Sequence, residues 1–163
     1  MAIICCKNNV YMIFSDSIEA DNGVNFDKMF DKHFEVDELI AVPIVELNRK
    51  GYITTFSCAG HPFFWSLEYK NHEEEQEHSK SIFYDKEDHL YFYADRYNGD
   101  QAYIAFEKEY EFDTLPDGWY KDKNAIRIDY PENLSNHELY RVIMKAVDSL
   151  YIWVSSLACI NHN

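Results

Sequence analysis

The sequence predicts an α+β fold: an antiparallel or mixed sheet of about six strands with two main helices packed on it. Short runs of β-branched and aromatic residues recur between polar segments, and 17% of the 163 residues are aromatic. Two longer segments repeat apolar residues at helical spacing. Only five Gly and four Pro interrupt regular elements. A chain of this length suits a single globular domain spanning residues 1–163.

Strand-like segments alternate with polar turns along the chain. They predict strands at residues 2–6, 10–14, 52–57, 63–69, 90–97, 101–110 and 125–130. Asn8-Asn9 fits the tight turn of a hairpin between the first two strands. Asn98-Gly99, the pair best suited to a type I′ turn, predicts a second hairpin that joins residues 90–97 to residues 101–110.

Two segments predict helices, near residues 38–50 and 135–157. Asp37 is a candidate N-cap of the first, and Gly51 fits the left-handed position that follows a helix. Pro43 lacks an amide donor, so this helix is either kinked or begins later than Asp37. The second helix opens with a capping-box pattern, Ser135 with Glu138.

The charge balance is strongly acidic. Asp and Glu number 29 against 15 Lys and Arg, for a net charge of −14, and no Lys/Arg cluster interrupts this pattern. Nucleic-acid binders neutralise phosphates with basic residues, so direct nucleic-acid binding is disfavoured, as is binding to anionic membranes. The charge favours a solubilising role. The alternative is an acidic protein-interaction module, including a mimic of nucleic-acid charge, that binds a basic protein partner.

Cysteine usage and the lack of a signal pattern predict a cytoplasmic protein. Cys5 and Cys6 are adjacent, while Cys58 and Cys159 lie far apart, which makes a poor disulfide framework. The N-terminus lacks a basic region followed by a long apolar run. No stretch approaches the roughly 20 apolar residues that span a bilayer. We therefore expect reduced thiols and no membrane segment.

The loop Ser57-Cys58-Ala59-Gly60-His61 is the candidate functional site, because it follows a predicted strand that would present it rigidly. Cys58 and His61 are candidate catalytic residues, as a thiolate–imidazolium pair. Ser57 and Gly60 are candidate binding residues for a small molecule, since successive amides in such a turn form an anion nest. The alternative is a structural turn in which Cys58 is a small buried residue and His61 lies at the surface.

A metal site is disfavoured. Cys58-x-x-His61 offers two zinc ligands, and His72, His78 or His89 are candidates to complete a tetrahedron. A strong zinc pattern has two closely spaced ligand pairs, and the second pair is missing here. We expect no metal, and the residues indicate no particular cofactor.

The segment that carries the loop also resembles known proteins. The matching residues are Val36-Asp37-Glu38-Leu39-Ile40, Leu47-Asn48, Gly51-Tyr52, Thr54 and Ser57-Cys58-Ala59-Gly60. They resemble the wybutosine-synthesising methyltransferase-type proteins of tRNA modification over residues 36–61. The resemblance implies S-adenosylmethionine-dependent methyl transfer onto a modified guanosine. The segment is also similar to small uncharacterised bacterial and phage proteins with a Gly-Tyr-x-Thr strand before Ser-Cys-x-Gly-His.

Overall fold

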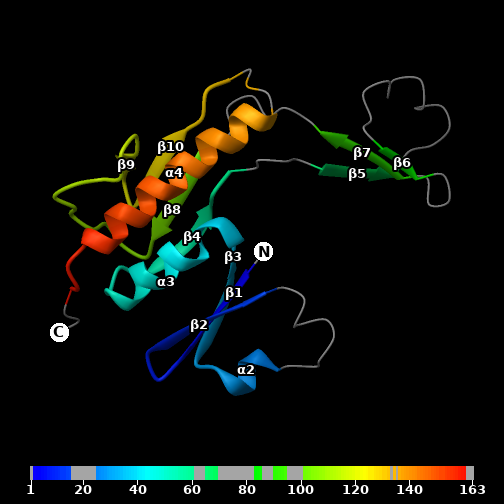
Figure 1. Cartoon of the computed structure of the whole chain (residues 1–163). Coiled ribbons are helices and arrows are strands. Elements are labelled where there is room, and N and C mark those ends of the chain that lie inside the picture. Colours follow the sequence, from blue (N-terminus) through cyan, green and yellow to red (C-terminus); the bar gives the residue numbers. More distant parts are fainter. Residues whose placement is uncertain are drawn as a thin grey trace.

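The computed structural model has an α+β fold, which confirms the predicted class (Figure 1). The structure describes residues 2–15, 25–60, 65–69, 83–85, 90–94, 101–132, 134 and 136–160. Within these residues, the strands form three antiparallel sheets rather than one. Each predicted strand overlaps an observed one, and two main helices lie where the apolar spacing predicts them.

The first sheet is built on the N-terminal hairpin. Strands β1 (Ala2–Lys7), β2 (Val10–Ser15) and β3 (Lys32–Val36) pair in the order β2-β1-β3. Asn8 and Asn9 adopt φ angles of 51° and 63°, as a two-residue hairpin turn requires, and confirm the predicted turn. The sequence pattern does not predict β3, because this edge strand carries charged residues at its exposed positions.

One face of this sheet packs against a short helix, and the other face belongs to the main core. The short helix α2 (Phe26–Met29) packs Phe26 against Ile3 and Cys5 on one face. The other face carries Ile4, which is fully buried and belongs to the main hydrophobic core.

Helix α3 (Ala41–Arg49) follows a short 3₁₀ turn, η1 (Glu38–Ile40). Because α3 begins at Ala41, Pro43 lies in its first turn, where its missing amide has no intrahelical acceptor to lose. Of the two alternatives left by the sequence, the later start is therefore confirmed. Asp37 occupies the predicted N-cap position, ahead of η1, but its side chain makes no capping hydrogen bond.

The end of α3 is a Schellman motif. The Tyr52 amide donates to the Leu47 carbonyl at 2.9 Å, and the Gly51 amide donates to the Asn48 carbonyl at 3.1 Å. Gly51 has a φ of 93°, which a residue with a Cβ adopts only with strain. The predicted C-terminal position of Gly51 is confirmed.

The second sheet has the order β4-β8-β10-β9. Its strands are β4 (Thr54–Cys58), β8 (Gln101–Phe106), β10 (Ala125–Asp129) and β9 (Tyr120–Asp122). Strand β8 alternates buried and half-buried residues, and its inward set is Ala102, Ile104 and Phe106. Helix α4 (Asn136–Ser156) runs across this sheet (Figure 1). It begins where predicted, although Ser135 of the predicted capping box lies outside the described residues.

The predicted hairpin around Asn98-Gly99 is wrong for its described strands. Strand β7 (Leu90–Ala94) pairs with β5 (Trp65–Tyr69) and β6 (Phe83–Asp85) in a third sheet of order β5-β7-β6. Strand β8 instead pairs with β4 and β10. The turn propensity of Asn98-Gly99 predicts that β7 pairs with β8. In the structure β8 pairs with strands that are more distant in the sequence. Asn98-Gly99 itself lies outside the described residues.

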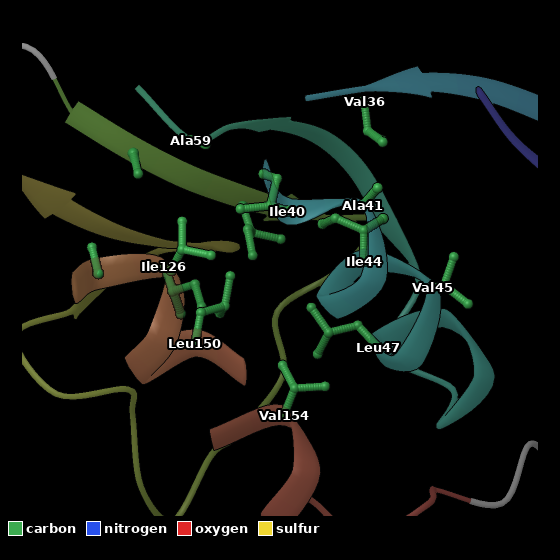
Figure 2. Packing of buried hydrophobic residues seen from close by; sticks show 14 of the residues in the cluster. Val36, Ile40, Ala41, Ile44, Val45, Leu47, Ala59, Ile126, Leu150 and Val154 are labelled. Atoms are coloured by element: carbon green, nitrogen blue, oxygen red, sulfur yellow. The ribbon is translucent and has the colours of Figure 1, made fainter. Parts of the chain in front are cut away.

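The main core lies where α3, α4 and the sheets meet. Helix α3 contacts α4 as well as β1, β2 and β4. Ile44, Leu47 and Leu150 are all fully buried, and Figure 2 shows Leu47 facing Val154 across the contact between the two helices. Burial of such side chains contributes roughly 1.5–3 kcal/mol each.

Among the described residues, no helix is both long enough and apolar enough to cross a membrane.

Candidate functional site

The predicted loop begins at the last residues of β4. Ser57 and Cys58 are half-buried, whereas Ala59 is completely buried. Gly60 has a φ of 92°, in the left-handed region that favours glycine. His61 lies outside the described residues, so its pairing with Cys58 stays a prediction.

Two side chains from other elements hold this loop at Ala59. The Ala59 amide donates to Oδ2 of Asp37 at 2.9 Å. The hydroxyl of Tyr130, which follows β10 and is buried, donates to the Ala59 carbonyl at 2.8 Å. Both backbone polar groups of a buried residue are therefore paired, as burial demands. Sequence reasoning missed these roles, because neither residue lies near the loop in the chain.

The sulfur of Cys58 receives a contact from its own loop. The Gly60 amide donates to Sγ of Cys58 at 3.4 Å. Since the Ala59 amide is bound by Asp37, the two successive amides expected to form an anion nest are both engaged within the chain. Ligand binding through Ser57 and Gly60 stays a prediction. None of the four cysteines is in a disulfide.

A second feature is a row of exposed carboxylates that follows β8. We define the acidic rim as Glu107, Glu109, Glu111, Asp113 and Asp117, which are all exposed. Between them, Tyr110 is buried and Phe112 packs against the core. The alternation Glu-Tyr-Glu-Phe-Asp therefore turns aromatic rings inward and carboxylates outward.

The aromatic residues fix the backbone of the rim. The Tyr110 hydroxyl donates to the Gly51 carbonyl at 3.2 Å and accepts from the Ile53 amide at 3.1 Å. The Phe112 ring packs edge-on against Trp153, with 5.1 Å between ring centroids. Burial raises the pKa of Tyr110, which keeps its hydroxyl neutral and able to donate.

Two basic side chains lie within the rim. Lys121 Nζ lies 2.9 Å from Glu109 and 3.1 Å from Glu111, and hydrogen bonds to these two carboxylates raise the pKa of its ammonium group. Lys108 lies over the Tyr110 ring, 5.3 Å from its centroid. The five carboxylates outnumber these two ammonium groups, so the rim stays negative.

An open groove of about 250 Å³ adjoins the rim at Asp117. One wall is the loop at residues 114–117, and the other is the C-terminal half of α4. The lining residues are Thr114, Leu115, Pro116, Asp117, Ser149, Ile152, Trp153 and Ser156. None of them is basic. Ile152 is 74% exposed, a large exposed fraction for an aliphatic side chain in this groove.

Hydrogen bonds join the two walls. Trp153 Nε1 donates to the Thr114 carbonyl at 2.7 Å, and Ser149 Oγ lies 3.2 Å from the Asp117 carbonyl. The groove is therefore preformed. The sequence pattern does not predict the groove, because Ile152 falls outside the apolar stripe of α4 and the loop residues come from a distant part of the chain.

The part of the chain that the structure describes has no group of three or more His, Cys, Asp or Glu residues that could hold a metal ion.

Comparisons of the chain with protein-family models, with curated proteins and with solved structures gave no match. The resemblance of residues 36–61 to the tRNA-modifying family stays a prediction.

Proposed function

We propose that this protein is an interaction module that binds a basic partner protein through the acidic rim. The observation that carries this proposal is the rim itself: five exposed carboxylates on a backbone held by the buried Tyr110 and the partly buried Phe112. A surface that is already ordered loses little entropy on binding, which favours affinity. A net charge of −14 also attracts a basic partner over a distance and accelerates association.

The surroundings of the rim support a protein as the partner. Protein interfaces combine an apolar centre with a polar periphery. The rim adjoins a groove that contains the exposed Ile152 and the buried Trp153. A nucleic acid would meet the same carboxylates with its own negative charge, which repels it.

Selection from a random peptide library displayed on phage tests the proposal. We expect the enriched peptides to be rich in Lys and Arg. The rim variant Glu109→Gln/Glu111→Gln should lose this enrichment, since it removes two rim charges and leaves Lys121 without the two carboxylates it contacts.

A charge-matched variant supplies the control. Glu35→Gln/Glu132→Gln removes two exposed carboxylates outside the rim and should retain the selected peptides. Peptides without a basic bias, equal losses for the two variants, or no enrichment at all would each contradict the proposal.

A second candidate function is ligand binding or catalysis at the loop Ser57–His61. The contact from the Gly60 amide to Cys58 Sγ favours it, because an N–H donor stabilises the thiolate. The test is the pH profile of Cys58 alkylation by iodoacetamide in a Cys159→Ser background. A midpoint at least one pH unit below about 8.5 supports a reactive thiol, while an ordinary midpoint contradicts it.

A further inference from the structure

We infer that the groove between residues 114–117 and α4 receives one apolar side chain of the basic partner, whose Lys or Arg residues flank that side chain and face the acidic rim. This inference rests on the proposed function and names the contact that gives it specificity. Charge alone attracts many basic proteins, whereas an apolar anchor in a shaped groove distinguishes among them.

The lining of the groove fits an apolar occupant. Four of its eight lining residues are apolar: Leu115, Pro116, Ile152 and Trp153. The polar atoms nearby are largely engaged, since Trp153 Nε1 donates to Thr114 and Ser156 Oγ donates to the Trp153 carbonyl at 2.7 Å. An apolar guest therefore displaces water without leaving these groups unpaired.

The size of the groove fits one side chain. Its volume is about 250 Å³. A cavity of about 150 Å³ already holds a benzene molecule, so this groove is large enough for a branched aliphatic or aromatic group. Ile152, at 74% exposure, offers apolar surface on the α4 side of the groove.

The charges around the groove determine what flanks the anchor. Asp117 lines the groove, and Asp113 and Asp148 directly precede lining residues in the chain and are exposed. Lys145 is exposed one helical turn before Ser149 and puts a positive charge on that side of the groove. The partner's basic residues therefore face the loop at residues 113–117 and not the Lys145 turn.

Three synthetic peptides test the inference: a Leu flanked on both sides by Lys runs, the same peptide with Gly in place of Leu, and a Leu flanked by Glu runs. Binding is followed by the NMR signals of the Trp153 indole N–H and the Ile152 methyl groups. The Leu–Lys peptide should bind about fivefold to tenfold more tightly than the Gly–Lys peptide. It should also shift both reporter signals.

Matched variants locate the effect. Ile152→Asn should abolish the preference for Leu over Gly. Val10→Asn changes another exposed aliphatic residue, 57% exposed in the N-terminal hairpin, and should keep that preference. Neither substitution removes a buried side chain, so both variants should fold.

The outcomes separate this inference from the proposed function. If both Lys peptides bind equally well and more tightly than the Glu peptide, the groove inference is wrong and the acidic rim still stands. If the Lys peptides bind no better than the Glu peptide, the proposed function fails and the inference fails with it.

Discussion

The indole Nε1 of Trp153 donates a hydrogen bond to the Thr114 carbonyl at 2.7 Å and thereby ties α4 to the loop that forms the opposite wall of the groove. The Trp153 ring is 4% exposed and packs against Phe112, which lies between two carboxylates of the acidic rim. One side chain therefore links the groove to the rim. This arrangement predicts that the two surfaces act together.

The end of α4 depends on Lys50. Its Nζ donates to the carbonyl of Val154, in the last turn of α4, at 2.8 Å and to the carbonyl of Leu157, directly after the helix, at 2.6 Å. We expect Lys50→Met to lower the free energy of unfolding by about 1–2 kcal/mol, measured by urea denaturation. Lys7→Met, an exposed control, should change it by less than about 0.5 kcal/mol. Equal effects would contradict the capping role.

Tyr130 stabilises the loop after β4. Tyr130→Phe removes the donor to the Ala59 carbonyl and leaves a buried acceptor unpaired. We expect a loss of about 1–2 kcal/mol in the free energy of unfolding. Tyr151→Phe, at a tyrosine that is 39% exposed, is the matched control and should be nearly neutral. A neutral Tyr130→Phe would show that the hydroxyl does not hold the loop.

The Asp37 carboxylate should restrain access to Cys58. Asp37→Ala removes the acceptor of the Ala59 amide, so the loop should open more often. In a Cys159→Ser background, we expect the rate of Cys58 modification by a maleimide to rise up to about tenfold. Glu35→Ala, at an exposed residue of β3, serves as the control. An unchanged rate for Asp37→Ala would mean that the loop stays closed without this bond.

Alkaline pH should destabilise the fold through Tyr110. Burial raises its pKa above the ordinary 10.0, so the folded state keeps a proton that the unfolded chain loses. The contribution of the protonated Tyr110 to the free energy of unfolding is fully present below about pH 10. It is lost as the pH rises through the folded-state pKa. Tyr110→Phe should make the free energy of unfolding, measured by urea denaturation, decline less with pH. Part of the decline should remain, because burial also raises the pKa of Tyr52. A decline as steep in the variant would exclude Tyr110 as its source.

Local patterns predicted most of the fold. The Asn8-Asn9 turn, the Gly51 helix end and the apolar stripe of α4 depend on nearby residues, and all three are confirmed. The Asn98-Gly99 hairpin failed because the pairing of β8 is decided by β4 and β10, which are distant in sequence.

The candidate site was less accessible to sequence reasoning. The loop at Cys58 was identified from its Gly and its place after a strand. Its partners Asp37 and Tyr130 come from separate elements, and tertiary contacts alone bring them to Ala59. The same holds for the groove, whose walls are joined across more than 30 residues of chain by Ser149 and Asp117.

The affinity of the Leu–Lys peptide for two variants of equal net charge decides whether the acidic rim binds a basic partner. Fluorescence anisotropy at low salt should show that Glu109→Gln/Glu111→Gln binds about fivefold more weakly than Glu35→Gln/Glu132→Gln. This difference should shrink as salt screens the charges. Equal affinities for the two variants would mean that only the total charge attracts the peptide, and would contradict a binding role for the acidic rim.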